Sequence, residues 1–335
     1  MTTEAKLQIT STELGTLWMS YQTLSAAVAA CNVFKEKAIN KDVQNMITAY
    51  VAEREKIINE IENIFNNAKA VIPIGFGEQD IIREVPPLFD DIFFVMFLRQ
   101  ISKLHLGHSA VFSAMSYMKE VNDVLKLKYD VSNKYYVLAT NYLLGKGVLA
   151  RPPYVTMPKQ VEFIEDKNYM SGFNAFSEKR SLNTIEVGYI NEAIEYNIFN
   201  MQLLTGFAQV AKESEVKKYF IEGKELSKNV IEELSSVLLQ SDIQPPSSWA
   251  GKATDSTEAP FSDKLMMYIN SLTAITALGF TGLGTSFSMR NDLPVKLGLI
   301  SKNTFQYSKK GAKIMIKHKW MEEPPQMEDR NQLTK

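Results

Sequence analysis

The chain contains an internal repeat that spans nearly its whole length. Glu13-Leu14-Gly15 is matched by Glu186-Val187-Gly188, an offset of 173 (186 − 13). From Pro73 and Pro245 onward the offset is 172 (245 − 73). The further pairs at that offset are Phe89 and Phe261, Asp91 and Asp263, Gly107 and Gly279, and Pro152-Pro153 and Pro324-Pro325. Because the markers keep their order with one single-residue slip, we expect two tandem copies of one structural unit.

The composition is that of an ordinary soluble globular protein. Apolar residues make up 45% of the 335 residues and charged residues 22%, and each half is long enough to bury its own core. The 37 basic and 38 acidic side chains leave a net charge of −1, so no strong field attracts nucleic acid. The single cysteine, Cys31, excludes an intrachain disulfide, and its place on an apolar stripe predicts a buried, inert thiol.

Each copy is predicted to form four helices. In the first copy, apolar residues recur every three or four positions over 14–31 and 43–65. A third helix is expected after Pro86-Pro87, where Asp90-Asp91 suit the positive end of a helix, and a fourth over 122–145. The corresponding helices of the second copy are expected near 187–204, 214–240, 261–289 and 292–319.

The connections between these helices predict the topology. Only a few residues join the first helix to the second and the third to the fourth, so each of these pairs is expected to be antiparallel. About eighteen residues, around Pro73 and Pro245, separate the second helix from the third. Such a segment reaches about 60 Å when extended, more than the length of about 40 Å of a helix of this size. The sequence therefore predicts an all-α fold of two tandem ferritin-like four-helix bundles with a long crossover in each.

These boundaries divide the chain into four parts. We expect a first bundle over 1–150, a packed linker over 151–180, a second bundle over 181–321 and an extended tail over 322–335. The linker is expected to pack against the bundles and fix their angle, because it is too apolar for a flexible tether. Its apolar and aromatic residues are Tyr154, Phe163, Ile164, Tyr169, Phe173 and Phe176.

Neither a secretory signal nor a membrane span is expected. Residues 1–6 lack a basic stretch that leads into an apolar run, which predicts synthesis in the cytoplasm. The uncharged run from Leu265 to Met289 is long enough to cross a bilayer. It carries many serine, threonine and asparagine residues, however, so we expect a buried core helix.

The sequence lacks the ligand set with which ferritin-like bundles hold two irons. That site needs a carboxylate from each of two helices and a Glu-x-x-His pair from each of the other two. No glutamate stands three residues before His105, His108 or His318. We therefore expect no cofactor and no catalytic residues. His105 and His108, three positions apart on one helix, are only weak candidates for a metal, since Arg99 and Lys103 lie upstream and repel a cation.

Two charged groups are candidates for binding. Arg99, Lys103 and His108 form the first, and a ligand or partner would meet them at a core cavity. The repeat places Ser271, Ile275 and Phe280 at the matching positions, so this site belongs to one copy only. The second group is the basic last helix, where an acidic partner could dock on Lys309, Lys310 and Lys313; the alternative is a solvated face. The acidic residues Glu192, Glu195, Glu222 and Glu225 are predicted to be solvated charges.

The repeat, the crossovers and the Pro-Pro ends resemble those of a known family. The chain is similar to the tandem ferritin-like proteins of endospore-forming bacteria, which are themselves distantly similar to spore coat protein F. The residues that carry the resemblance are Glu13-Leu14-Gly15, the helix starts at Asp91 and Asp263, and Arg151-Pro152-Pro153. The resemblance implies association with the spore or its coat, and it transfers no catalytic residue.

These observations favour a non-enzymatic structural or assembly protein of spores that self-associates or binds protein partners. The alternative is a ligand-binding or cryptic enzymatic bundle with a core cavity near Arg99, Lys103 and His108. A regulatory adaptor that docks through its basic last helix is a third hypothesis.

Overall fold

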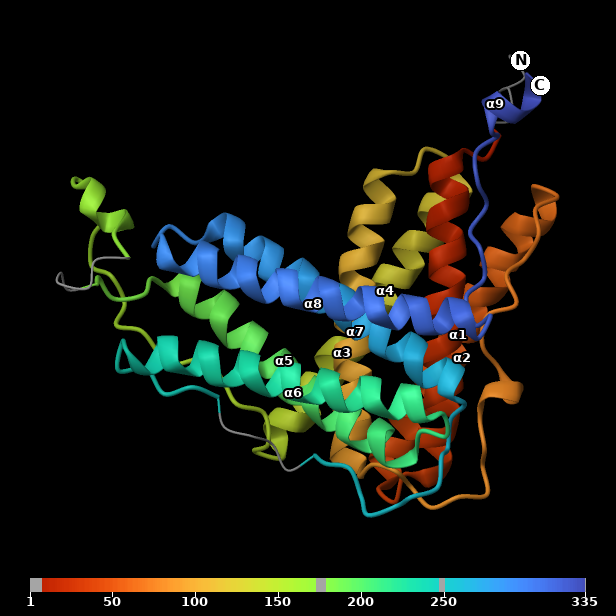
Figure 1. Ribbon diagram of the computed structural model, residues 1–335, viewed down its shortest axis with the longest axis horizontal. Coiled ribbons are helices and arrows are strands. Elements are labelled where there is room, and N and C mark those ends of the chain that lie inside the picture. The colour runs from red at the N-terminus through yellow and green to blue at the C-terminus, as the bar shows by residue number, and fades with distance from the viewer. Residues whose placement is uncertain (1–7, 173–178, 247–250, 335) are drawn as a thin grey trace.

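The computed structural model describes residues 8–172, 179–246 and 251–334, and these form helices but no β-sheet (Figure 1). The helices of the first repeat are α1 (Ser11–Lys37), α2 (Lys41–Asn67), α3 (Asp91–Ala114) and α4 (Lys119–Gly145). Those of the second repeat are α5 (Thr184–Val210), α6 (Ser214–Leu239), α7 (Asp263–Phe287) and α8 (Asp292–Lys317). Short helices lie in the connections and the tail: η1 (Glu78–Asp80), η2 (Lys167–Met170) and α9 (Arg330–Leu333). The predicted all-α fold of two tandem bundles is confirmed.

Each bundle contains the predicted crossover. In Figure 1 the first bundle stands upright and the second lies across it. Residues 68–90 run back along the first bundle, so α3 begins at the end where α2 begins (Figure 1). Residues 240–246 and 251–262, the described parts of the second crossover, connect α6 to α7 in the same way.

A buried glutamate closes the first bundle at the start of α1. Glu13 forms a capping box with Thr10, in which each side chain accepts a hydrogen bond from the other's backbone N–H. Its Oε1 also accepts hydrogen bonds from the backbone N–H groups of Tyr117 and Met118, at 2.7 and 2.6 Å. These donors lie between α3 and α4, so one carboxylate satisfies the start of α1 and fixes the second hairpin to it.

Glu186 has the same role in the second bundle. It accepts hydrogen bonds from the backbone N–H groups of Met289 and Arg290, which the repeat places opposite Tyr117 and Met118. Burial alone would raise the pKa of Glu186, but hydrogen bonds from the Arg180 guanidinium and from backbone N–H groups outweigh it and hold that pKa at about 2. This shared contact is the physical reason why the Glu-x-Gly marker recurs.

A second pair of carboxylates holds the other end of each bundle. Asp91, at the start of α3, accepts hydrogen bonds from the backbone N–H groups of Ile39 and Asn40, at 3.1 and 2.6 Å. Asp263, at the start of α7, accepts the equivalent bonds from residues 212–213, at 3.1 and 2.8 Å. Each aspartate therefore ties the turn of the first hairpin to the start of the second.

The two crossovers pair with each other and relate the repeats by a pseudo-twofold axis. Isolated antiparallel bridges join Ile81 to Phe261 and Phe89 to Ala253. The repeat makes Ile81 equivalent to Ala253 and Phe89 equivalent to Phe261, so the two bridges are symmetry-related. The two bundles thus meet as the subunits of a twofold dimer do.

The two bundles share a core, because a phenylalanine of each repeat packs against residues of the other repeat. The Phe261 ring packs edge-on against Phe34 of the first repeat, at 5.9 Å between centroids. Phe89 packs in the same way against Phe207 of the second repeat, at 6.2 Å. A Cβ at Gly206 would lie 2.5 Å from the Phe89 ring, so glycine is required there. One hydrophobic cluster accordingly contains buried residues from both bundles.

The linker differs from its prediction. Tyr154 and Phe163 are each 85% exposed, and all of 151–166 is exposed, so this segment does not pack against the bundles. Phe173 and Phe176 lie outside the described residues. Tyr169 does pack, with the Arg180 guanidinium 4.0 Å from its ring centroid. The expected role of the linker is taken by the crossovers, whose direct pairing sets the angle between the bundles.

The helix α7 is the one described helix long and apolar enough to cross a membrane by length and composition. It packs against α1, α5 and α8, and about half of its residues are buried. Such contacts are typical of a core helix, as the polar residues of this segment predicted.

We predict that Glu186→Gln lowers the free energy of unfolding by about 1–3 kcal/mol at pH 7, because buried donors lose their ionised acceptor. The pKa of Glu186 falls from 4.5 to about 2 on folding. Its contribution is therefore complete above pH 4.5 and is lost as the pH falls towards 2. Urea unfolding of the wild type and the variant at pH 7, 5 and 3 measures the difference in their free energies of unfolding, which should become smaller as the pH falls. Glu55→Gln, at an exposed position, is the control and should change the stability by less than about 0.5 kcal/mol.

Candidate functional site

An apolar cleft of about 650 Å³ lies between the two repeats. Its walls are α1 and α3 of the first repeat and α7 and α8 of the second. Binding sites for small molecules commonly have volumes of about 300–1,000 Å³ and mostly apolar walls. Large apolar side chains line the cleft, among them Trp18, Met19, Phe76, Phe112, Met267, Met315 and Trp320.

A covering segment, residues 320–324, lies along one edge of the cleft. The two carboxylate oxygens of Glu322 accept hydrogen bonds from the backbone N–H groups of Ile74 and Gly75, both at 2.8 Å. Gly75 has a φ of 65°, a conformation that favours glycine. The chain after α8 is thereby fixed to the first crossover and runs beside α1 (Figure 1).

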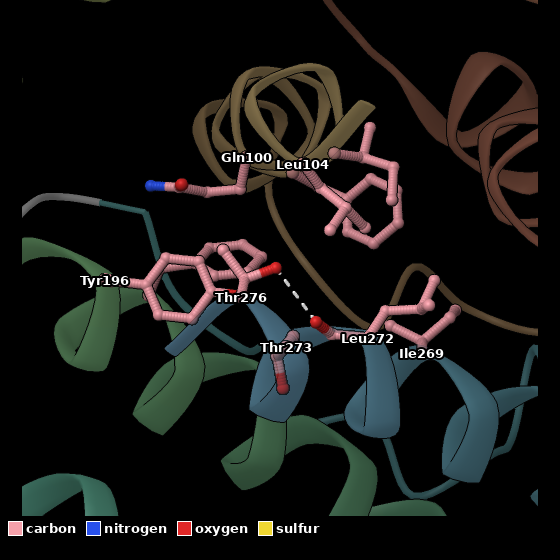
Figure 2. A pocket seen from close by; sticks show the side chains of 10 residues that line it. Gln100, Leu104, Tyr196, Ile269, Leu272, Thr273 and Thr276 are labelled. Atoms are coloured by element: carbon pink, nitrogen blue, oxygen red, sulfur yellow. Dashed lines mark hydrogen bonds between the residues drawn. The ribbon is translucent and has the colours of Figure 1, made fainter. Parts of the chain in front are cut away.

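A second, much smaller cavity lies on the pseudo-twofold axis. Its volume is about 20 Å³, enough for about one water molecule. Figure 2 shows that its walls come from α3, α5 and α7, with Gln100 and Leu104 on one side and Thr276 on the other. Positions 100 and 104 are equivalent to 272 and 276, which also line the cavity, so the axis passes through it. We interpret this space as a packing gap between the repeats.

Across the axis from the cleft, the equivalent groove is filled by ion pairs. The Arg99 guanidinium, on α3, pairs with Glu195 of α5, and both side chains are buried. Lys103 pairs with Glu192 at 2.5 Å. The Arg99 side chain also donates a hydrogen bond to Thr140 Oγ1 at 3.1 Å. We call this cluster the filled groove.

The residues that occupy the filled groove have smaller or uncharged counterparts in the cleft. The equivalent pairs, filled groove first, are Arg99 and Ser271, Lys103 and Ile275, Tyr136 and Ser308, Thr140 and Ala312, Glu192 and Met19, and Glu195 and Gln22. The cleft is therefore the same groove of the repeat, left open because the side chains that would fill it are absent.

The structure separates the three residues predicted for one cavity. Arg99 and Lys103 are held in the filled groove by glutamates of the second repeat. His108 lines the cleft instead, and burial together with the nearby Lys128 lowers its pKa to about 4. The cleft is thus near only one of the three, and the imidazole that faces it is neutral at pH 7.

Glu192 and Glu195 also differ from their prediction as solvated charges. Both pair with cations across the repeat interface, and Glu195 is buried. The sequence contained one signal for this pairing. Arg99 and Lys103 stand on a helix without acidic residues after Asp91, so their partners had to come from another segment.

The two candidate metal ligands occupy different surroundings. His105 is fully buried in the core of the first bundle, where its pKa is well below its usual value because of burial and the charges of Arg54 and Lys128. His108 reaches the cleft. In the described part of the chain, no three His, Cys, Asp or Glu side chains are grouped closely enough to hold a metal ion.

Three lysines of the basic helix α8 pair within the chain. Lys296 contacts Glu233 at 3.0 Å, Lys310 contacts Glu222 at 2.5 Å, and Lys317 contacts Glu215 at 2.7 Å. These pairs lie at the surface and contribute little to stability. Docking of an acidic partner on this helix stays a prediction.

Comparisons with known proteins give a family but no activity. The model of a family described as "Protein of unknown function (DUF3231)" matches residues 1–161 and 170–333, one segment for each repeat. No curated protein matches the chain. A solved structure from Bacillus halodurans C-125, titled as a "putative spore coat protein", is similar at 16% identity and a TM-score of 0.42. The match covers 45% of this chain and 98% of that one.

We predict that Arg99→Met lowers the free energy of unfolding by about 3 kcal/mol, because the buried Glu195 carboxylate loses its guanidinium partner and keeps only the longer ion-pair contact with Lys103, at 3.7 Å. Adding Glu195→Leu should recover part of the loss, since the double variant buries no unpaired charge. Urea unfolding of the wild type, the two single variants and the double variant measures the coupling. Additive effects of the two substitutions would contradict the pairing.

Proposed function

The chain belongs to the DUF3231 family of proteins of unknown function, and we propose that it binds an apolar small molecule, such as a lipid with one acyl chain, between its two repeats. The observation that carries the proposal is the open cleft of about 650 Å³. Ion pairs fill the groove that the pseudo-twofold axis makes equivalent to it. A space of this size and lining lowers the free energy of an apolar ligand by about 25 cal/mol for each Å² of apolar surface removed from water.

The lining supports binding without catalysis. His108 lines the cleft, but its buried Nδ1 forms no hydrogen bond with a described lining residue that would make a nucleophile and base pair. Glu322 is the acidic residue of the lining, and backbone N–H groups occupy both of its carboxylate oxygens. We therefore assign the cleft to storage, transfer or sensing of its ligand.

A second candidate function is assembly in the spore, and the exposed linker favours it. Residues 151–166 carry several highly exposed apolar side chains, an arrangement typical of a segment that another protein covers. The most exposed are Tyr154, Met157, Val161 and Phe163. The sequence resemblance to ferritin-like proteins of endospore formers also supports association with the spore. In this hypothesis the linker of one molecule contacts a second copy or a coat protein.

Ligand binding is tested by filling the cleft with the residues of its symmetric counterpart. A fluorescence titration with Nile red, an uncharged apolar dye, should give saturable binding of one dye per wild-type chain. The variant Met19→Glu, Gln22→Glu, Ser271→Arg and Ile275→Lys copies the filled groove into the cleft. We expect it to bind the dye at least about tenfold more weakly, a loss of about 1.4 kcal/mol.

The matched control alters the filled groove alone. Lys103→Ile with Glu192→Met removes the two ion pairs of Lys103, with Glu192 and Glu195, and leaves the cleft unchanged, so dye affinity at the cleft should be retained. Circular dichroism shows whether each variant is folded. Equal dye binding by the wild type and the cleft-filling variant would contradict the proposal.

Assembly is tested in sporulating cells with a tagged chain. We expect the wild type to fractionate with the spore layers, because its exposed linker is covered there. Tyr154→Asp with Phe163→Asp should shift it to the soluble fraction, whereas Lys159→Ala, in the same segment, should not. A double variant that stays in the spore fraction would contradict the role of the linker.

A further inference from the structure

Two basic side chains, Arg54 and Lys128, meet in the centre of the first bundle, and burial together with the Arg54 charge lowers the pKa of Lys128 to about 7. Arg54 on α2 and Lys128 on α4 are both fully buried. Among the described residues, neither forms an ion pair with a carboxylate. Arginine and lysine are almost never fully buried unless they are paired. The guanidinium remains charged at every pH at which proteins fold, so a net positive charge stays in this core.

Several buried hydrogen-bonding groups of α2 and α3 have no partner in the described chain. They include Arg54 Nε, the Tyr50 hydroxyl, the Ser102 hydroxyl and both ring nitrogens of His105, and all of these atoms are buried. Most of them are donors or can become donors. Each such group left unsatisfied costs about 1–3 kcal/mol.

Arg54, Lys128 and the groups near them come from all four helices of the bundle. Arg54 donates hydrogen bonds to the Lys128 carbonyl at 3.3 Å and to Ser132 Oγ, on α4, at 2.9 Å. The Lys128 ammonium donates to Ser20 Oγ, on α1, at 3.0 Å. The Arg54 guanidinium lies 4.8 Å from the centroid of the Tyr50 ring. His105, from α3, is close enough that both cations disfavour its protonation.

The second bundle has none of this chemistry at the equivalent positions. The repeat places Ser227 opposite Arg54 and Ile300 opposite Lys128. His105 is replaced by Ala277, and Tyr50 by Gly223. The cluster is therefore specific to the first bundle, and the shared fold does not require it.

We propose that the centre of the first bundle binds one small inorganic anion of the size of chloride, held by Arg54, Tyr50 and His105. An anion there pairs the guanidinium charge and gives the free N–H and O–H groups an acceptor. A metal cation is repelled at the same place. Because protein interiors are closely packed, a single-atom ion fits this centre better than a polyatomic one. The proposal is independent of the ligand in the cleft.

Halide dependence of stability gives the first test. Thermal unfolding of the full chain is compared in sodium chloride, sodium bromide and sodium gluconate at equal ionic strength. An ion that binds only the folded state raises Tm by mass action. We expect both halides to raise Tm by about 2 °C or more over gluconate. Equal Tm values in the three salts would overturn the proposal.

Crystals grown in sodium bromide give the position of the bound anion. The anomalous signal should show one peak within hydrogen-bond distance of Arg54 and Tyr50 in the first bundle. Peaks on the surface alone, or an ordered water at the centre, would overturn the assignment.

Variants of the proposed anion ligands test whether the halide effect on Tm and the bromide peak come from the same site. Arg54→Met with Lys128→Met replaces the cations by apolar chains of similar length and should remove both the halide effect on Tm and the bromide peak. If this variant does not fold, Tyr50→Phe removes a single donor and should reduce the halide effect. Ser227→Ala, at the position equivalent to Arg54, is the control and should leave the effect unchanged. Persistence of the full halide effect in the first two variants would overturn the assignment.

Discussion

Carboxylates buried where loops close onto helix ends hold each four-helix unit in its topology. Glu13 and Glu186 join the start of the first helix to the turn of the second hairpin. Asp91 and Asp263 join the start of the third helix to the turn of the first hairpin. An ionised acceptor with several backbone donors is among the stronger hydrogen-bonded arrangements in proteins. The crossovers, the shared core and the cleft all depend on hairpins fixed in this way.

The pseudo-twofold axis explains both what the repeats share and where they differ. Phe89 and Phe261 exchange places across the axis, so the interface is the same from either side. The grooves beside it are equivalent in backbone but not in side chains. Arg99 and Lys103 fill one of them, while Ser271 and Ile275 leave the other open. Duplication within one chain permits this difference, which two identical subunits could not have.

The sequence predicts the architecture well and the site poorly, for physical reasons. Helix periodicity and connection lengths are local properties, so the eight long helices and both crossovers could be derived from them. The pairing of Arg99 with Glu195 joins residues far apart in the chain, and it follows only once the two bundles are placed. The cleft consists of small and apolar residues that are indistinguishable from core positions in a single copy. Only comparison of Ser271 and Gln22 with their equivalents reveals that side chains are missing there. The linker was predicted to pack because of its aromatic content, but composition does not show which surface covers a segment.

The exposed linker has a consequence for how the molecule responds to proteases. Residues 151–166 form an exposed stretch of the covalent connection between the bundles. The bundles are also held together by shared phenylalanine side chains and by the paired crossovers. A cut in this stretch breaks the chain but none of those contacts. The two fragments would therefore remain together and migrate as one particle under native conditions, separating only in denaturant. The intact chain behaves as a heterodimer whose subunits are synthesised at a fixed one-to-one ratio.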